Sequence, residues 1–595
     1  MPPTSPGRLL STRLFICLSL GMLLCLALIS LRNYVPIHYR YVSKTTLGTA
    51  SGDLTSHNFA IVIDAGSSSS KVHLFHWPPH DGNPHKLLEI YPLTDVQGDP
   101  LVKKVEPGIS TFASTPAAAF NSLVPLLAYA SHHIPSVKHP HTVLYVLGTA
   151  GMRLLSLGHQ ERIMDYIAAA VSREYPFHLS KDGIQVISGK LEGVFSWITI
   201  NYLLGNFSPE SHAHAHTAGS EHIHTVGVMD MGGASLQIAF EVPQQIEVHN
   251  DKIVEINLGC GLLDNEHKHR VYSMTYLGYG SNTVRTKYYT SLAKHFNTSN
   301  HTALRGPILK DPCSQQGLTE NVTLSANRWV RVRGSGNFPS CRTALLTGTA
   351  VSNGSCGPKA CLEGEKSAFE KPPGYLGYAS MNFYGTSEFW YTMRDVLGIG
   401  GAYSAREFER KSTEFCSTEW RLVRDRFARD LYTYANLYRL RSQCLKSAWL
   451  SVVLHEGLEF PRESLSLRTL STLRGQSVAW PLGALLYLTR YLPLREVQLQ
   501  QQQHRSTVAS QWELHSITHS TLTLPLLAVL CVILILLACR HRRGQHSPLL
   551  FPGSNISLPR SFSQASGLKV HRRAGSVSNP SLPRIQSSGN IDWIV

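Results

Sequence analysis

The chain has 595 residues, enough for three or four compact units or one large two-lobed unit. Apolar residues make up 43% and charged residues 16%, so a sizeable core is possible and disorder throughout is excluded. The formal net charge of +15 is concentrated at the two ends, five charges before Asp53 and a net seven after residue 539, which disfavours a broad nucleic-acid-binding surface on the nearly neutral body.

Two uncharged apolar runs explain the basic ends. Residues 14–31 and 522–539 are each eighteen residues long, just enough for a helix to cross a bilayer. An arginine cluster follows the second run, as in a stop-transfer segment. A cleaved signal peptide is the alternative for the first run, but no small-residue cleavage site follows it. The pattern predicts two transmembrane helices, with both ends of the chain in the cytosol and the body facing the lumen or the exterior.

The cysteines and glycosylation sequons agree with that topology. Seven cysteines lie in the body without a Cys-x-x-Cys pair, which favours disulfides in an oxidising compartment over zinc. One of the seven must be free or pair between chains. The body carries five glycosylation sequons, which are expected to be used in a lumen: Asn206, Asn297, Asn300, Asn321 and Asn353.

Composition divides the chain into seven segments. The expected segments are a cytosolic tail (1–13), a transmembrane helix (14–31), a lumenal stalk (32–57), a globular body (58–497), a glutamine-rich stalk (498–521), a second transmembrane helix (522–539) and a disordered basic cytosolic tail (540–595).

A short internal repeat is the most informative signal in the body. The segment from Phe59 to Ser70 recurs in type from Val226 to Ser235: an apolar strand ends in Asp-x-Gly, and small residues and a second strand follow. Each copy predicts a β-hairpin with a tight turn. Backbone N–H groups and hydroxyls of such turns can hold phosphate oxygens, while Asp64 and Asp230 can hold a divalent cation, directly or through water. A plain hairpin turn is the alternative for either copy alone.

Two further segments lie between the copies. Residues 143–148 predict a strand that runs into a glycine-rich turn at Thr149, which could face a phosphate or a water molecule; an ordinary strand–helix turn is the alternative. Glu192 opens a predicted helix, where a carboxylate often only compensates the helix dipole. Together the four segments supply what phosphoanhydride hydrolysis needs: bound phosphates, a cation and a base for water.

Five motifs in the right order then resemble the apyrase-conserved regions of the nucleoside triphosphate diphosphohydrolase family. They are Asp64–Lys71, Gly148–Arg153, Ser188–Gly193, Asp230–Gln237 and Phe383–Tyr391. The likeness spans residues 58–495 and is greatest to the intracellular, two-span Golgi or lysosomal branch, through segments such as Gln443–Trp449.

The resemblance implies an α/β, two-lobed actin/hexokinase/Hsp70-like (ribonuclease H-like) fold with the nucleotide in the cleft. We expect lobe I at about 58–188 and 477–497, and lobe II at about 189–476. The resemblance also implies Glu192 as the general base and Asp64 and Asp230 around a Ca²⁺ or Mg²⁺ ion. It implies that Trp390 or Tyr391 stacks on the nucleobase; core packing is the alternative for these two aromatic residues. The remaining phosphate- or nucleotide-binding residues it implies are Ser67, Ser68, Ser70, Lys71, Thr149, Gly232, Gly233, Ala234, Ser235 and Gln237.

Two positions depart from the family pattern. Ser69 stands where the family has glycine, and a serine there would strain the loop if φ were positive. Lys71 stands where the family has arginine, and lysine loses bidentate phosphate geometry. The resemblance also implies a Cys416–Cys444 disulfide; Cys260–Cys313 and Cys356–Cys361 are plausible further pairs, which would leave Cys341 over.

The sequence therefore predicts a membrane-bound lumenal hydrolase of nucleotides such as UDP, GDP, UTP or CTP. By family analogy it would clear nucleoside diphosphates in the secretory pathway, in Golgi membranes first, in lysosomal or other vesicle membranes next, and at the plasma membrane third. The alternatives are a polyphosphatase or kinase of the same superfamily and a catalytically silent ectodomain. Nucleic acid is not an expected partner, and an oligomer is left open.

Overall fold

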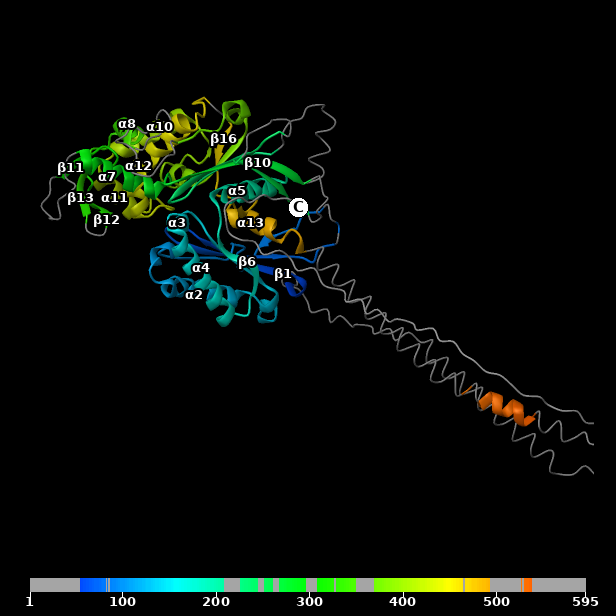
Figure 1. Ribbon diagram of the computed structural model, residues 1–595. Helices are drawn as coiled ribbons and strands as arrows, with labels where there is room; N and C mark the ends of the chain where they lie inside the picture. The colour runs from blue at the N-terminus through cyan, green and yellow to red at the C-terminus, as the bar shows by residue number, and fades with distance from the viewer. Residues whose placement is uncertain are drawn as a thin grey trace, which may run out of the picture. The chain divides into compact units, whose positions relative to one another are not determined.

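The computed structural model of the protein describes residues 54–207, 225–243, 251–259, 267–295, 308–325, 328–348 and 369–492, except positions 82, 84, 85, 464 and 465, together with residues 526 and 529–537. The chain divides into two units, residues 1–503 and residues 504–595. The described part of the first unit is a two-lobed α/β body (Figure 1). The described part of the second unit is helical, with exposed side chains.

Within these described residues, no helix combines the length and the apolar character that crossing a membrane requires. The predicted segment 14–31 lies outside them. Of the predicted segment 522–539, residue 526 and residues 529–537 are described.

The first lobe is built on a six-stranded sheet. Its strands are β1 (Asn58–Ala65), β2 (Ser70–Trp77), β3 (Tyr91–Pro92), β4 (Val102–Val105), β5 (Val143–Gly148) and β6 (His178–Val186). They lie in the order β3-β2-β1-β5-β6, with β4 also paired to β2. The β1–β2 pair is antiparallel, whereas β5 runs parallel to β1 and to β6. The helices of this lobe are η1 (Leu54–Ser56), η2 (Ile109–Phe112), α2 (Pro116–His133), η3 (Ser136–His141), α3 (Ala150–Arg153) and α4 (Leu157–Glu174).

Alternation along β1 explains how its sheet is covered on both sides. Ile61 and Ile63 pack with residues of α2 and α4, whereas Ala60 and Val62 belong to a second core on the opposite face. Successive side chains of a strand point to opposite faces, so an apolar strand of this kind is buried on both.

The second lobe repeats the plan with a seven-stranded sheet. Its strands are β7 (Gly227–Met231), β8 (Ser235–Glu241), β9 (Ile253–Asn257), β10 (Lys268–Leu277), β14 (Phe383–Ser387), β15 (Gly401–Ala402) and β16 (Leu467–Thr469), in the order β15-β16-β14-β7-β8-β10-β9. Smaller sheets are formed by β11 (Ile308–Asp311), β12 (Thr319–Ser325) and β13 (Arg328–Gly334), and by β17 (Thr472–Leu473) and β18 (Gln476–Ser477).

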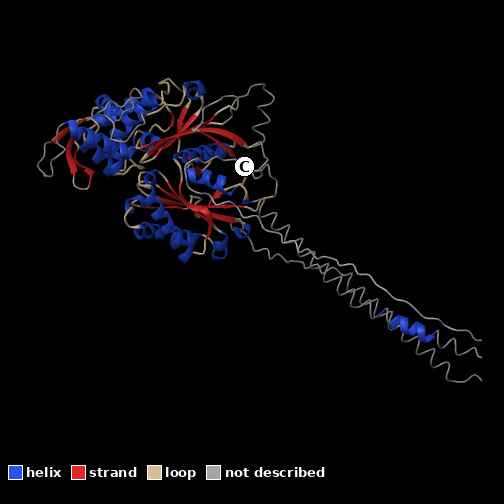
Figure 2. Ribbon diagram, viewed as in Figure 1, coloured by secondary structure: helices blue, strands red, loops and turns tan. Residues whose placement is uncertain are grey.

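Helices cover the outer face of this sheet and lie between the two lobes (Figure 2). The outer helices and turns are α7 (Ser281–His295), α8 (Phe338–Gly348), η4 (Gly374–Leu376), η5 (Tyr378–Ser380), α9 (Glu388–Trp390), η6 (Tyr391–Val396), α10 (Ala405–Ser417), α11 (Trp420–Ala428), α12 (Leu437–Val452) and η7 (Val453–Gly457). Between the sheets lie α5 (Gly189–Leu204) and α13 (Trp480–Thr489), which share one apolar core with strands of both lobes.

The same strand arrangement therefore occurs twice. In each lobe three antiparallel strands (β1, β2, β3; β7, β8, β10) adjoin two strands parallel to the first (β5, β6; β14, β16). The predicted two-lobed α/β fold is confirmed. The division into lobes near residues 189 and 477 stays a prediction.

The disulfides correct part of the predicted pairing. Cys416 of α10 is bonded to Cys444 of α12, as the family resemblance implies. The predicted Cys260–Cys313 pair is wrong, because Cys313 is bonded to Cys341, with a Cα–Cα distance of 4.7 Å. Cys341 lies on α8, which packs beside the end of β11, and this neighbourhood is set by tertiary packing rather than by spacing along the chain. Cys260, Cys356 and Cys361 lie outside the described residues.

Two of the five predicted glycosylation sites are described. Asn321 is exposed on β12. Asn206 follows α5, is half-buried and donates a hydrogen bond to Asn201. Asn297, Asn300 and Asn353 lie outside the described residues.

Candidate active site

Most of the predicted site residues line one cleft of about 1010 Å³. Those that line it are Asp64, Ser67, Ser68, Lys71, Thr149, Glu192, Asp230, Gly232, Gly233, Ala234, Ser235 and Tyr391. They come from both lobes and from α5, so the fold brings together segments that are more than 300 residues apart in the sequence.

The hairpin of the first lobe places Asp64 opposite the positively charged Lys71. Asp64 lies one residue before the end of β1 and is paired in register with Lys71 of β2. The turn between the strands is closed by a hydrogen bond from Gly66 N to Ser69 O, 3.0 Å long. Thr149 N donates to Ala65 O at 3.1 Å, so the turn after β5 is held beside this hairpin.

The hairpin of the second lobe has the same geometry 166 residues later. Asp230 of β7 is paired in register with Gln237 of β8, and Gly232 N donates to Ser235 O at 2.9 Å. In both hairpins the aspartate lies one residue before the end of the first strand, a backbone hydrogen bond closes the turn, and the residue seven positions after the aspartate is paired with it. Both turns present small residues and backbone N–H groups to the cleft, as anion binding requires.

The two turns approach each other closely across the cleft. A Cβ atom added to Gly233 would lie 2.8 Å from Ser67 Oγ, and one added to Gly151 would lie 2.5 Å from Ser67 Cα. A larger residue at Gly151 would push the backbone of the first turn away, whereas one at Gly233 would displace the side chains of Ser67 and Asn282. Close approach therefore requires glycine at position 151, since neither position has a positive φ.

Glu192 is held at the bottom of this cleft by two donors. It lies in the first turn of α5, whose N-cap Ser188 accepts a hydrogen bond from Leu191 N. Arg153 Nη2 donates to Glu192 Oε2 at 2.7 Å, and Gln237 Nε2 donates to the same oxygen at 3.0 Å. Neither bond uses Oε1, so this oxygen remains available to accept a proton from water.

Burial raises the pKa of two of the three carboxyl groups. It raises the pKa of Glu192 to about 7, although the Arg153 guanidinium opposes that change. Burial also raises the pKa of Asp64 to about 6, with Lys71 opposing and Asp230 adding to the increase. A general base is most effective when its pKa lies near the working pH, so Glu192 has the pKa expected of a base that works near neutrality.

Asp64 and Asp230 suit a cation that keeps most of its water. Asp230 Oδ2 accepts a bond from Ser196 Oγ at 3.4 Å, whereas its buried Oδ1 has no hydrogen-bond partner. A buried carboxylate oxygen without a donor is favourable for a cation or its bound water. In the described part of the chain, no three His, Cys, Asp or Glu side chains are close enough to hold an ion by themselves. Two carboxylates and several waters are the usual environment of Mg²⁺.

Three predicted residues do not line the cleft. Gln237 is buried behind it and contacts Glu192 instead. Ser70 is fully buried at the start of β2. Trp390 packs against the loop at Gly400, where an added Cβ would meet its ring at 2.7 Å. Of the two aromatic candidates for the nucleobase, Tyr391 lines the cleft, whereas the half-buried Trp390 contacts the loop at Gly400.

The departures at Ser69 and Lys71 leave the first turn intact. Among the described residues, the non-glycine positions with positive φ are Ser387, Asp430, Glu459 and Arg474. Ser69 is not among them, so the strain considered from the sequence does not arise. Lys71 lines the cleft as a single positive charge.

Several residues of the cleft were missed by the sequence interpretation. They are Ser281, Asn282, Glu388, Tyr438, Arg439 and Lys446. A signal was present for Lys446, which is a lone charge within the apolar run 444–450, and for Glu388, which lies inside the fifth motif. Their meeting depends on the packing of α7, α9 and α12, which spacing does not encode.

Most of the chain is similar to known proteins. The model of the GDA1/CD39 (nucleoside phosphatase) family matches residues 52–505. Ectonucleoside triphosphate diphosphohydrolase 7 of Pongo abelii is 39% identical over 510 residues, which cover 82% of each chain. Ectonucleoside triphosphate diphosphohydrolase 4 of Homo sapiens is 36% identical, covering 85% of this chain and 86% of its own. Nucleoside-diphosphatase mig-23 of Caenorhabditis elegans is 34% identical, covering 75% of this chain and 79% of its own.

Proposed function

Because the chain belongs to the GDA1/CD39 (nucleoside phosphatase) family, we propose that this enzyme hydrolyses nucleoside tri- and diphosphates such as UDP, GDP, UTP and CTP, and releases inorganic phosphate. The observation that carries the proposal is the meeting of Asp64, Asp230 and Glu192 in one cleft between two matching turns. The names of the relatives, which specify nucleoside triphosphate diphosphohydrolases and a nucleoside-diphosphatase, support the substrate class.

The two turns bind the terminal phosphates. Ser67 and Ser68 from the first lobe and Gly232 to Ser235 from the second offer N–H groups and hydroxyls to the phosphate oxygens, and Lys71 adds a positive charge. Asp64 and Asp230 would hold a Ca²⁺ or Mg²⁺ ion through water. Such an ion, when bound, neutralises charge that develops on the phosphate oxygens.

Glu192 accepts the proton of the attacking water. Arg153 and Gln237 fix its side chain through Oε2, which leaves Oε1 to receive the proton. The two turns hold the phosphorus atom in place, so the oxygen of the water attacks phosphorus as the bond to the bridging oxygen breaks. Tyr391 stacks on the nucleobase at the far end of the cleft.

We also propose that the enzyme is anchored by helices at 14–31 and 522–539, with its body in the lumen of the Golgi or of lysosomal or other vesicles. There it would remove the nucleoside diphosphates that glycosyltransferases leave behind. The basic ends of the sequence, the sequons and the body disulfides support this placement.

The direct test is phosphate release by the full-length protein in detergent with UDP and Ca²⁺. Glu192→Gln keeps the shape of the side chain but removes the base, so activity should fall by about a hundredfold or more. The wild-type rate should also fall as the pH is lowered through about 7, because protonation removes the base.

Glu320→Gln is the matched control. Glu320 is another largely buried carboxylate of the second lobe, paired with Arg285 outside the cleft. This variant should keep most of the wild-type activity. Retained activity in Glu192→Gln, with normal folding, would remove Glu192 from its proposed role; no phosphate release by the wild type from any nucleotide would reject the proposed function.

A further inference from the structure

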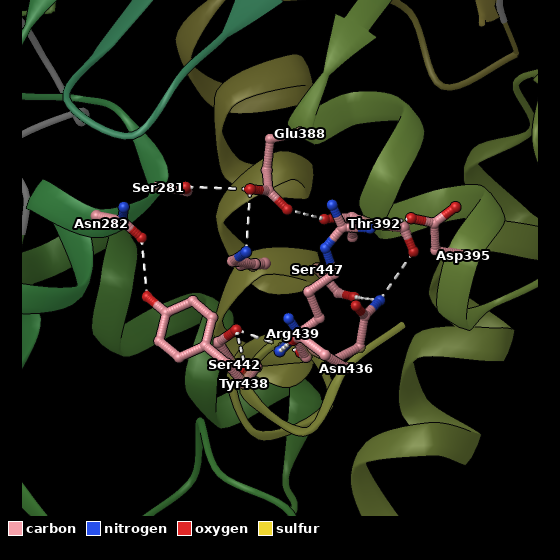
Figure 3. A network of polar contacts seen from close by, with 12 residues as sticks. Ser281, Asn282, Glu388, Thr392, Asp395, Asn436, Tyr438, Arg439, Ser442 and Ser447 are labelled. Atoms are coloured by element: carbon pink, nitrogen blue, oxygen red, sulfur yellow. Dashed lines mark hydrogen bonds and ion pairs between the residues drawn. The ribbon is translucent and has the colours of Figure 1, made fainter. Parts of the chain in front are cut away.

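A buried ion pair lies on the second-lobe wall of the cleft. Lys446 Nζ of α12 lies 3.0 Å from Glu388 Oε2 of α9, and the two side chains are 7% and 12% exposed. Both residues line the cleft. Figure 3 shows Glu388 in a polar network, between Ser281 and Thr392.

The pair has unused hydrogen-bonding capacity. Glu388 Oε2 accepts from Lys446 and from Ser281 Oγ, and Oε1 accepts from Thr392 Oγ1 at 2.9 Å. A carboxylate has about four acceptor positions, so Glu388 can accept one further bond. Among the described residues, the Lys446 ammonium donates to Glu388 alone and lies 5.7 Å from the centre of the Tyr438 ring, which leaves two of its three donors for a ligand.

The position of the pair is fixed between two parts of the site. On one side, Ser281 N donates to Gly232 O at 3.0 Å, which joins the network to the second phosphate turn. On the other side, Tyr391 follows Glu388 by three residues and carries the Arg439 guanidinium over its ring, 4.4 Å from the centre. A nucleotide that bound with its phosphates at the turn and its base at Tyr391 would have its ribose beside Glu388 and Lys446.

The two opposite charges of the pair determine which kind of group the pair can bind. A phosphate would be attracted by Lys446 but repelled by Glu388, because the Glu388 carboxylate lies only 3.0 Å from the Lys446 ammonium. A hydroxyl group can accept from the ammonium and donate to the carboxylate at the same time. The pair is therefore suited to a neutral group that both donates and accepts hydrogen bonds.

We propose that Glu388 and Lys446 bind the ribose hydroxyl groups of the nucleotide and make the enzyme selective for ribonucleotides. This inference rests on the proposed function. The residue before Glu388 supports it: Ser387 also lines the cleft and has φ 54° and ψ −117°, a conformation that a serine rarely adopts. Backbone strain of this kind is retained where it directs a functional side chain.

The test compares UDP with its 2′-deoxy and 3′-deoxy forms, using the full-length protein in detergent with Ca²⁺. For the wild type, kcat/KM should fall by about tenfold or more when a bound hydroxyl is absent, the effect of losing one hydrogen bond to a charged group. The double variant Glu388→Gln/Lys446→Met removes both charges at once, so no unpaired charge remains buried. Its ratio of ribose to deoxyribose activity should fall to within about twofold of one.

Arg285→Met/Glu320→Gln is the matched control, because it removes another ion pair of the second lobe whose residues do not line the cleft. It should keep the wild-type ratio. The proposal is overturned if the wild type does not discriminate, or if the Glu388/Lys446 variant keeps the full ratio. It is also overturned if that variant alters only the ranking of UDP, CDP and GDP, since the pair would then bind the base edge. Activity on UDP without ribose discrimination would reject this inference and leave the proposed function standing.

Discussion

The two hairpins of the cleft share a backbone but differ in the side chain that faces the aspartate. In the first lobe, Asp64 is paired in register with Lys71, and both line the cleft. In the second lobe, Asp230 is paired with Gln237, which is buried and donates to Glu192. The same turn thus places a lysine in the cleft in one lobe and a hydrogen-bond donor to Glu192 in the other.

This difference shows how a repeated element acquires two tasks. Equal strand registers place both aspartates at equivalent positions, because the turn-closing bonds Gly66 N–Ser69 O and Gly232 N–Ser235 O fix the two hairpins alike. The residue that faces each aspartate differs: Lys71 lines the cleft, whereas Gln237 donates to Glu192. Under the proposed function, the first hairpin would bind substrate and the second would orient Glu192. Substitutions at equivalent positions should therefore have equal effects for the two aspartates and unequal effects for Lys71 and Gln237.

The largest effect on activity is expected at the two equivalent aspartates, Asp64 and Asp230. Asp64→Asn and Asp230→Asn should each lower kcat/KM for UDP by about a hundredfold or more, because each removes a charge that holds the cation. Both variants should also need more Ca²⁺ for half-maximal rate, which a Ca²⁺ titration of phosphate release would measure. An effect confined to one of the two variants would contradict the equivalence of the hairpins.

Smaller effects, different in kind for the two lobes, are expected at Lys71 and Gln237, the residues paired with the aspartates. Gln237→Met should lower kcat by about tenfold with little change in KM, since it removes one hydrogen bond to the charged base. Lys71→Met should mainly raise KM, because its charge acts on bound phosphate. Steady-state kinetics on both variants would separate the two tasks, and a common change in KM would show that the residues act alike.

The smallest effect is expected at Ser69. Because its φ is not positive, Ser69→Gly should leave kcat/KM within about twofold of the wild type and lower stability slightly through the added chain freedom. Thermal unfolding and phosphate release would test this together. A large gain in activity would mean that the serine does restrain the first turn.

Much of the site was predictable because its residues lie in local motifs. The Asp-x-Gly turns at Asp64 and Asp230 and the helix start at Glu192 are encoded by short segments, so they could be placed from the sequence. The division between Trp390 and Tyr391 could not, since it depends on which side chain the loop at Gly400 covers. The Cys313–Cys341 bond was missed for a similar reason: α8 meets the end of β11 only in the folded lobe.

Resemblance to a known family implied the two-lobed fold, and the sequence by itself determined the repeated hairpins and the acids and small residues that a phosphate cleft needs. Those features follow from local periodicity and from the chemistry of single residues. Tertiary structure alone decided that Arg153 and Gln237 share one oxygen of Glu192, and that Glu388 meets Lys446 on the cleft wall. These contacts join segments 39 to 58 residues apart, and their distances arise from packing that no spacing along the chain specifies.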